Sequence, residues 1–229
     1  MKHFRITYII PVICVLLFSC AKEDEAPKPV DRTESFKNTV WGGDFQYAAG
    51  EYTDSQTFSI LLGADGTLTW YDVASTRPGG TWKMNQDTII ITFPNTTVIS
   101  ATVTDKSWSD FKGGLKAGFF INQLNRAVKV EPSTVSNTSW KGTFGGSELE
   151  ITILPGMKLN YSLAGSAPRS IPYTLEGAGI RFSYSELFSS ATNYVVFTNE
   201  TNLLRGTERR IGGLFPPTTV YYSYLASKL

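Results

Sequence analysis

The sequence NTVWGGDF at residues 38–45 returns ninety-nine residues later as NTSWKGTF at residues 137–144. The two stretches share the pattern Asn-Thr-x-Trp-x-Gly-x-Phe, with five identities in eight positions. The segments after the two motifs are also similar in kind, because apolar residues 58–62 and 149–153 each lead through a turn to a second apolar stretch. The chain therefore contains an internal duplication. We predict one repeat over residues 36–130 and a second over residues 131–229, with residues 131–136 as a short linker.

Within each repeat the apolar residues alternate with polar ones, which is typical of strands buried on one face. Leu149, Ile151 and Ile153, for example, are separated by Glu150 and Thr152. Turn sequences such as Asp-Gly and Pro-Gly recur about every eight to twelve residues, as antiparallel hairpins require. No stretch has helical spacing. The pattern predicts an all-β chain with seven or eight strands in each repeat, folded as two tandem antiparallel small barrels or as two β-sandwiches.

The first nineteen residues have the three parts of a secretory signal. Lys2 and Arg5 precede an apolar run from Ile6 to Phe18, and the small residue Ser19 follows. The run has thirteen residues, whereas a helix that crosses a bilayer core needs about twenty. Residues 1–19 are therefore predicted to be a signal peptide that is removed on export.

The signal ends on Leu17-Phe18-Ser19-Cys20, which resembles the lipobox of bacterial lipoproteins. Leu17, Ser19 and Cys20 match that pattern, and Phe18 is bulkier than the usual residue at its position. The resemblance implies that the Cys20 thiol receives a diacylglyceryl group, that the chain is cut before Cys20 and that the new amino terminus is acylated. Two or three acyl chains anchor a protein stably, whereas one holds it only marginally. The first expected partner is therefore a membrane, through the lipid anchor at Cys20.

Residues 20–35 are expected to form a lipidated linker. The run from Ala21 to Glu25, AKEDE, resembles the export signal that sends Bacteroidetes lipoproteins to the outside of the outer membrane. The same residues also suit a solvated tether whose charges keep it extended, and the two interpretations are compatible. We predict a protein anchored by lipid in the outer membrane and facing the cell exterior, with a folded part that begins near Phe36.

The mature chain contains no histidine. The single histidine, His3, lies in the signal with Cys14, so that Cys20 is the one cysteine left. This excludes a disulfide within the mature chain and excludes a Ser-His-Asp triad, a Cys-His pair and a histidine-ligated metal. Without Lys2 and Arg5, 19 basic residues stand against 20 acidic ones, which gives no electrostatic basis for binding nucleic acid. We expect no enzymatic activity, no metal and no other cofactor.

The Trp-x-Gly-x-Phe start of each repeat, followed by regularly spaced strands, resembles the lipocalin-like domains of Bacteroidetes lipoproteins. The resemblance covers both repeats, through these few residues and the strand spacing. It implies a barrel in each repeat and an early tryptophan, Trp41 or Trp140, that closes one end of it.

Five aromatic residues are candidates for contact with a ligand. Trp70, its counterpart Tyr161 in the second repeat, and Trp82 lie in predicted strands, where they could line a cavity or fill the core. Core filling is favoured, because an eight-stranded barrel is just wide enough for its side chains. Trp108 and Phe111 are predicted in a polar loop or hairpin end over residues 105–114, where an aromatic ring could support a sugar, contact a partner or cover the barrel.

Charged residues give weaker signals. Arg205, Arg209 and Arg210 are predicted around a turn, as an anion site or, more simply, as a solvated loop. Glu148 and Glu150 share one face of a single strand and are not the facing pair that glycoside hydrolysis requires. Two functions remain open. The protein binds a small apolar molecule or a glycan, or it is a structural module that docks onto other envelope proteins.

Overall fold

The computed structural model describes residues 31–47, 55–114, 119–198, 202–213 and 216–229. The predicted signal peptide and Cys20 lie outside these residues. Residues 31–229 form one compact unit that contains both repeats. Over the described ranges, no helix has the length and hydropathy needed to span a membrane.

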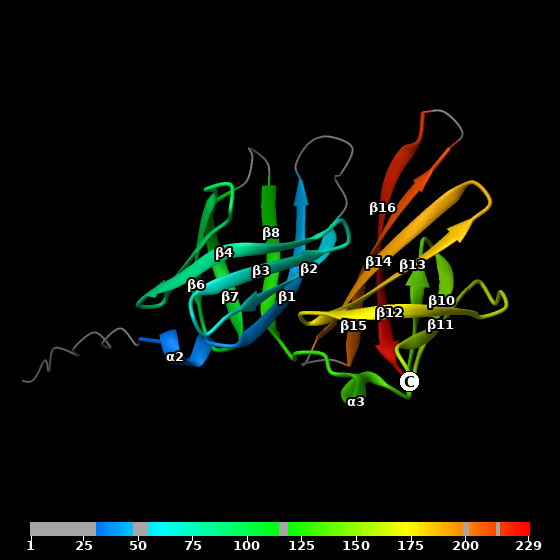
Figure 1. Cartoon of the computed structure of the whole chain (residues 1–229), viewed down its shortest axis with the longest axis horizontal. Coiled ribbons are helices and arrows are strands. Elements are labelled where there is room, and N and C mark those ends of the chain that lie inside the picture. Colours follow the sequence, from blue (N-terminus) through cyan, green and yellow to red (C-terminus); the bar gives the residue numbers. More distant parts are fainter. Residues whose placement is uncertain (1–30, 48–54, 115–118, 199–201, 214–215) are drawn as a thin grey trace, which may run out of the picture. The chain divides into compact units, whose positions relative to one another are not determined.

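Among the described residues each repeat has eight strands, and Figure 1 shows how they are arranged. Those of the first repeat are β1 (Thr39–Tyr47), β2 (Gln56–Leu62), β3 (Thr67–Asp72), β4 (Thr76–Asn85), β5 (Thr88–Thr92), β6 (Val98–Val103), β7 (Ser107–Gly113) and β8 (Phe119–Ala127). Those of the second repeat are β9 (Thr138–Phe144), β10 (Ser147–Leu154), β11 (Lys158–Leu163), β12 (Arg169–Glu176), β13 (Gly179–Glu186), β14 (Ser189–Thr198), β15 (Leu203–Gly212) and β16 (Thr218–Lys228).

Both repeats are closed antiparallel barrels in which each strand pairs with the next one along the chain. The first barrel closes where β1 pairs with β8, and the second closes where β9 pairs with β16. Closure leaves neither sheet with an exposed edge. The prediction of two tandem barrels with lipocalin-like topology is confirmed, and the alternative of two sandwiches is wrong.

A single-turn helix precedes each barrel, α2 (Thr33–Phe36) in the first repeat and α3 (Pro132–Val135) in the second. The sequence predicted a tether up to residue 35 and a linker over 131–136, so both predictions missed a helix. Four residues are too few to produce a helical period. The available signal was the start of α3, where Pro132 occupies the first turn and Glu131 and Thr134 form a capping box.

The Asn-Thr-x-Trp motif joins α2 to the first barrel. Asn38 has a φ of 55°, a left-handed conformation that asparagine tolerates. The Thr39 hydroxyl donates a 2.6 Å hydrogen bond to the Phe36 carbonyl and accepts a 2.8 Å bond from the Trp41 indole. The Trp41 ring stacks on the Phe36 ring at 4.9 Å, with both side chains fully buried. Trp41 therefore closes the α2 end of the barrel.

The second repeat uses the same motif in the same way. Asn137 has a φ of 63°, and the Thr138 hydroxyl donates to the Val135 carbonyl at 2.6 Å while it accepts from the Trp140 indole at 3.0 Å. The repeated residues are thus a structural joint between a helix and a barrel.

The glycine of the motif allows each barrel to close. A Cβ atom on Gly43 would overlap the carbonyl oxygen of Gln123 on β8, and a Cβ atom on Gly142 would overlap that of Leu225 on β16. A residue without a side chain is therefore needed where the first and last strands of each repeat approach each other.

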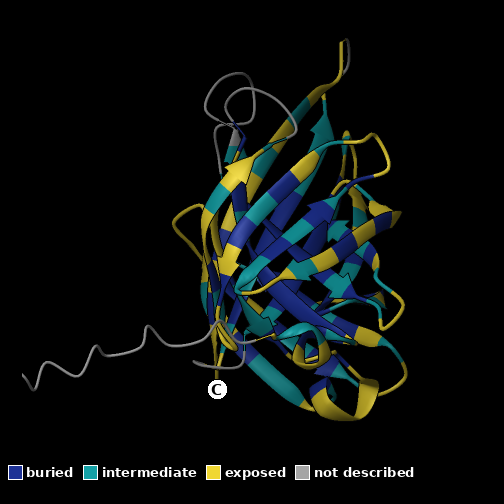
Figure 2. Cartoon of the chain, turned by 90° about the vertical axis from the view of Figure 1, so that its left-hand side faces the viewer, coloured by how far each residue is buried: buried dark blue, intermediate teal, exposed yellow. Residues whose placement is uncertain are grey.

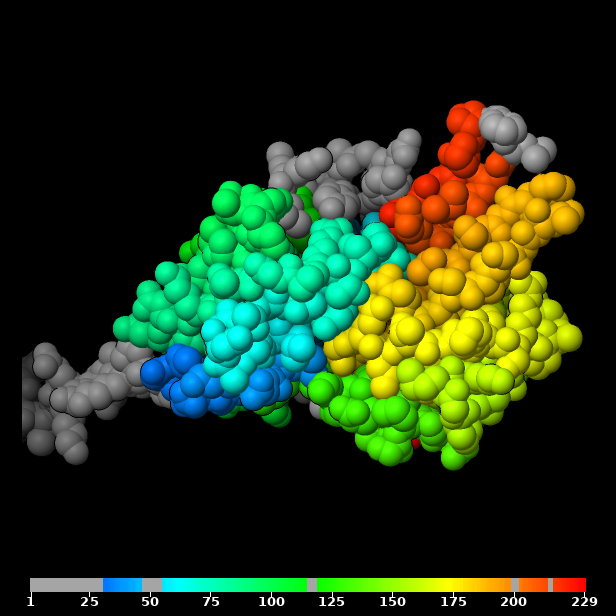
Figure 3. Space-filling view, viewed as in Figure 1, coloured from blue at the N-terminus to red at the C-terminus, as the bar shows by residue number. Residues whose placement is uncertain are grey.

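Buried and exposed residues alternate along many of the strands, and the buried ones form the cores of the two barrels (Figure 2). A separate buried cluster joins the two repeats, with Val40 and Ala127 of the first packed against Tyr194 and Val196 of the second. The Tyr194 hydroxyl lies 2.6 Å from the Ser59 hydroxyl, and its burial raises the pKa of Tyr194. On the face shown in Figure 3, the β12–β13 hairpin (yellow) lies against the β3–β4 region (cyan and green). The repeats thus share an apolar and hydrogen-bonded interface.

Candidate functional site

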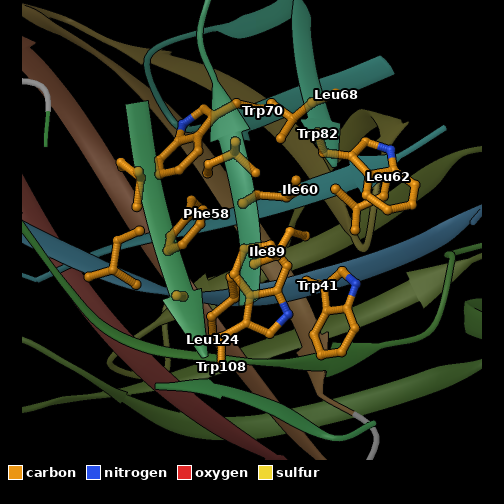
Figure 4. Close-up of a cluster of buried hydrophobic side chains, with 14 of the residues drawn as sticks. Trp41, Phe58, Ile60, Leu62, Leu68, Trp70, Trp82, Ile89, Trp108 and Leu124 are labelled. Carbon is orange, nitrogen blue, oxygen red and sulfur yellow. The ribbon is translucent and has the colours of Figure 1, made fainter. Parts of the chain in front are cut away.

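Trp70 and Trp82 belong to the core of the first barrel (Figure 4). The Trp70 ring stacks on Phe58 at 4.1 Å, and its indole nitrogen donates to Asp72 at 2.8 Å. The Trp82 indole donates to the Gly63 carbonyl at 2.9 Å. Both rings are buried and both indole donors are satisfied within the protein. Trp70 and Trp82 therefore fill the core of the barrel and do not line a ligand cavity.

Trp108 and Phe111 lie on strand β7, which follows the β6–β7 turn at residues 104–106, so the alternative of a loop is wrong and that of a hairpin holds. Trp108 is 4% exposed and packs against Trp41 at 5.4 Å, while Phe111 packs against the same core. The two aromatics are three residues apart, which breaks the alternation of a regular strand. The pairing of β6 with β7 shifts register here, and Asp110 has a φ of 52°. The extra residue of this bulge turns both rings toward the interior.

The interior of the second barrel contains a buried carboxylate, that of Glu208 on β15. Its side chain is fully inaccessible. The Tyr184 hydroxyl donates to one carboxylate oxygen at 2.7 Å, and the Asn193 amide lies 3.4 Å from the same atom. The Arg210 guanidinium donates to the other oxygen at 2.9 Å. Burial of a charge is tolerated here because the carboxylate is both paired and hydrogen-bonded.

Two further tyrosines complete this group, which we call the Glu208 cluster (Tyr161, Tyr184, Asn193, Glu208, Arg210 and Tyr224). The Tyr224 hydroxyl donates to the Asn193 carbonyl oxygen at 3.0 Å. The Tyr161 ring lies 5.4 Å from the Tyr184 ring, and the Tyr161 side chain is only 3% exposed. Its hydroxyl makes no hydrogen bond of normal geometry with the described residues, although it interacts with the Tyr184 hydroxyl. A buried hydroxyl without a good hydrogen bond is costly unless another molecule satisfies it.

The phenols of the Glu208 cluster are neutral hydrogen-bond donors at neutral pH. Burial, assisted by the hydrogen bond to Glu208, raises the pKa of Tyr184 to about 12. Burial also raises the pKa of Tyr161 and of Tyr224. For Arg210, burial acts to lower the pKa, but the electrostatic attraction of Glu208 and Tyr184 and the hydrogen bonds to these two groups together outweigh it, and the pKa is raised. The cluster therefore presents one carboxylate, one guanidinium, one amide and three protonated phenols.

A chain of charges leads from the Glu208 cluster to solvent. Arg210 lies 3.6 Å from Glu186, and Glu186 lies 3.2 Å from Arg169, whose guanidinium sits over the Tyr184 ring at 5.3 Å. The side-chain exposure rises along this chain, from 0% at Glu208 to 30% at Arg210 and 49% at Arg169. The cluster thus lies next to the end of the barrel that is opposite α3. The two arginines balance the two glutamates in charge.

The first barrel also has a buried carboxylate, that of Asp72, which accepts from the Trp70 indole and pairs with Arg77 at 3.2 Å. Trp70 stands where the second repeat has Tyr161, and it is surrounded by Phe45, Phe58, Phe93 and other apolar side chains. The duplicated barrels have therefore diverged: the buried carboxylate is bonded by a tryptophan and backbone amides in the first and by tyrosine and asparagine side chains in the second.

Sequence reasoning did not identify Glu208. Arg205, Arg209 and Arg210 were predicted around a turn, but all three lie on β15. Arg210 points to the interior with Glu208, whereas Arg205 lies 3.9 Å from Asp44 of the first repeat. The three arginines therefore do not form one anion site. Alternation along the strand could have indicated this pair, because Gly206, Glu208 and Arg210 are every second residue and so lie on one face of β15.

The pair Glu148 and Glu150 points to solvent, as predicted. Glu148 and Glu150 lie on an exposed face, where both pair with Lys141 at 3.0 and 3.3 Å. Across the part of the chain that the structure describes, no group of three or more histidine, cysteine, aspartate or glutamate residues could hold a metal ion.

No protein-family model matches this chain, and no curated protein matches it. Among solved structures, the chain is similar to a protein of unknown function from the DUF3598 family of Nostoc punctiforme PCC 73102. The two are 10% identical, with 87% of this chain and 100% of that chain covered and a TM-score of 0.27.

Proposed function

We propose that this chain is a lipid-anchored protein of the outer membrane that binds a small glycan at the Glu208 cluster, without catalysis. The observation that carries the proposal is the buried Glu208 carboxylate near one end of the second barrel, held beside a Tyr161 hydroxyl that makes no hydrogen bond of normal geometry with the described residues. Binding sites for small molecules combine mostly apolar walls with a few polar groups that fix orientation. The first barrel serves as a packed structural partner.

A hydroxyl-bearing ligand fits this chemistry better than an apolar one. Glu208 and Asn193 offer acceptors, while Arg210 and Tyr161 offer donors. An apolar ligand would offer no acceptor to the Tyr161 hydroxyl and would leave the remaining hydrogen-bonding capacity of the polar groups unused, which costs free energy. The ligand is expected to be neutral, because Arg210 and Arg169 are already paired with Glu208 and Glu186. Tyr161 and Tyr184 add ring faces on which a sugar can pack.

The sharpest test is the Tyr161→Phe variant, which removes one oxygen atom. Because this hydroxyl makes no hydrogen bond of normal geometry within the described protein, its loss should reduce stability by less than about 1 kcal/mol but should weaken glycan binding about tenfold, as expected for one buried hydrogen bond of about 1.4 kcal/mol. Glu208→Gln should weaken binding further, because it removes the charged acceptor. Titration calorimetry against neutral oligosaccharides selected on a glycan array measures both effects.

Tyr173→Phe is the matched control. Tyr173 lies on β12 of the same barrel, is 4% exposed and also has a hydroxyl with no hydrogen-bond partner among the described residues, but it makes none of the hydrogen bonds of the Glu208 cluster. Its variant should bind glycan like the unaltered chain. Equal losses in the two tyrosine variants, or the absence of any glycan ligand, would count against the proposal.

The membrane anchor has a separate test. Cys20→Ser removes the sulfur that would carry the diacylglyceryl group, so the protein should no longer incorporate labelled palmitate and should leave the membrane fraction. Cys14→Ser is the control, because Cys14 lies in the predicted signal. Unchanged sedimentation of the Cys20 variant with membranes would reject the anchor.

A second function, docking onto another envelope protein, is supported by the tip of the β13–β14 hairpin. Leu187 and Phe188 at this tip are 86% and 63% exposed. Adjacent exposed apolar side chains are typical of interaction surfaces. Cross-linking in cells through a photoreactive residue at position 187 would identify such a partner.

A further inference from the structure

A pocket lies at the α3 end of the second barrel, at the opposite end from the Glu208 cluster. Its volume is about 220 Å³. Its apolar lining consists of Val128, Val130, Val135, Trp140 and Phe197, and its charged lining of Lys129 and Lys228. Trp140 and Phe197 contact each other edge to face at 5.4 Å. The pocket thus combines an aromatic floor with two ammonium groups.

In the first repeat the corresponding end of the barrel, over Trp41, is covered by other side chains. Phe36 of α2 stacks on Trp41, and the Arg126 guanidinium lies 5.8 Å from the Trp41 ring on the outer side. Arg126 also donates to the Ser35 carbonyl at 3.2 Å, which ties the end of β8 to α2. As a result the Trp41 side chain has no exposed surface.

In the second repeat, two of the residues that cover the tryptophan of the first repeat are replaced. Val135 stands in the place of Phe36, since each lies three residues before the threonine of the shared motif. Lys228 stands in the place of Arg126, since Lys228 pairs with Trp140 as Arg126 pairs with Trp41. Valine lacks the ring that covers Trp41, and the Lys228 ammonium makes no hydrogen bond or ion pair with any described residue. The pocket is therefore a specific consequence of divergence between the duplicated halves.

We propose that this pocket binds a small anionic amphiphile, with its apolar part on Trp140 and its carboxylate or phosphate between Lys129 and Lys228. An apolar floor recovers the free energy of burying a short chain or ring, and two ammonium groups attract an anion. Lys129 has one weak ion pair, at 3.6 Å from Glu131, with both side chains more than half exposed. It remains able to turn toward a ligand. The volume limits the apolar part to a few carbon atoms or one ring.

The test uses the chain from Ala21 onward, which retains the whole compact unit, with hexanoate and hexyl phosphate as probes. Trp140 is the one tryptophan of the second repeat, so its indole signal in a ¹H–¹⁵N spectrum reports on this pocket. We expect saturable shifts of that signal with both anions, and at least tenfold weaker binding of hexanol, which has the same chain without charge. Equal binding of hexanol, or no shift with either anion, would overturn the proposal.

The matched variants exchange the sealing residues between the repeats. Val135→Phe with Lys228→Arg should close the pocket and abolish binding, and the four remaining indole signals should stay unchanged because the same residues already fit the first repeat. Lys129→Ala with Lys228→Ala is the milder variant and should weaken anion binding about tenfold. Retention of full affinity in either folded variant would refute the assignment.

Vesicles distinguish the two sources of such an anion. If the ligand is the headgroup region of a membrane lipid, phosphatidylglycerol vesicles should compete with hexyl phosphate, whereas phosphatidylcholine vesicles should not. If it is a free molecule, hexanoate and hexyl phosphate should bind while neither type of vesicle competes. Glycan binding at the Glu208 cluster should be unaffected by the sealing variant, so that failure of one proposal leaves the other standing.

Discussion

Gly142→Ala is expected to destabilise the protein by about 3 kcal/mol, which is large for the addition of one methyl group. The new Cβ atom would overlap the Leu225 carbonyl oxygen and lie 2.6 Å from the Ala226 Cα atom. Both are backbone atoms of β16, so no side chain can rotate away. The β9–β16 pairing closes the second barrel, and the strain therefore falls where the first strand of the repeat meets the last.

Chemical denaturation followed by circular dichroism measures this effect. Lys141→Ala on the same strand is the control, because Lys141 makes only exposed ion pairs with Glu148 and Glu150 and should change stability by less than about 1 kcal/mol. Gly43→Ala should reproduce the loss in the first barrel. If Gly142→Ala is as stable as the control within experimental error, the backbone at the β9–β16 pairing can relax to accommodate the methyl group.

Arg181→Ala is expected to cost about 2–3 kcal/mol and to uncouple the repeats. The guanidinium donates to the carbonyl oxygens of Asp72 and Val73 in the first repeat, at 2.6 and 3.0 Å, and makes two-pronged contact with Glu176 in the second. Hydrogen bonds of charged groups contribute more than neutral ones, and removal of the donor leaves partly buried acceptors without a partner. Only 18% of the side chain is exposed, so water replaces these bonds incompletely.

Calorimetry distinguishes this outcome from a simple loss of stability. The unaltered chain should unfold in one transition, because residues 31–229 form one compact unit, whereas Arg181→Ala should show two. Arg169→Ala is the control, since its ion pair with Glu186 is about half exposed and lies away from the first repeat. A single transition in Arg181→Ala at nearly unchanged temperature would mean that the apolar cluster around Tyr194 holds the repeats together without it.

The residues of the Glu208 cluster come from five strands, from Tyr161 on β11 to Tyr224 on β16. No local pattern connects them, and sequence reasoning found Tyr161 only as the counterpart of Trp70. It also placed Trp108 and Phe111 in a loop or hairpin end, because the bulge at Asp110 conceals their strand. Local alternation identifies strands reliably where it is regular and fails where an extra residue interrupts it.

The duplication and the all-β class can be predicted from the amino-acid sequence alone, because period-two alternation, turn residues and the repeated Asn-Thr-x-Trp-x-Gly-x-Phe motif are properties of neighbouring residues. The folded chain was needed to learn which residues form the Glu208 cluster, which end of the second barrel has a pocket over Trp140, and that the two repeats share one interface. These features depend on strand register and on contacts between residues far apart in the chain, where a shift of one residue would turn a side chain to the opposite face.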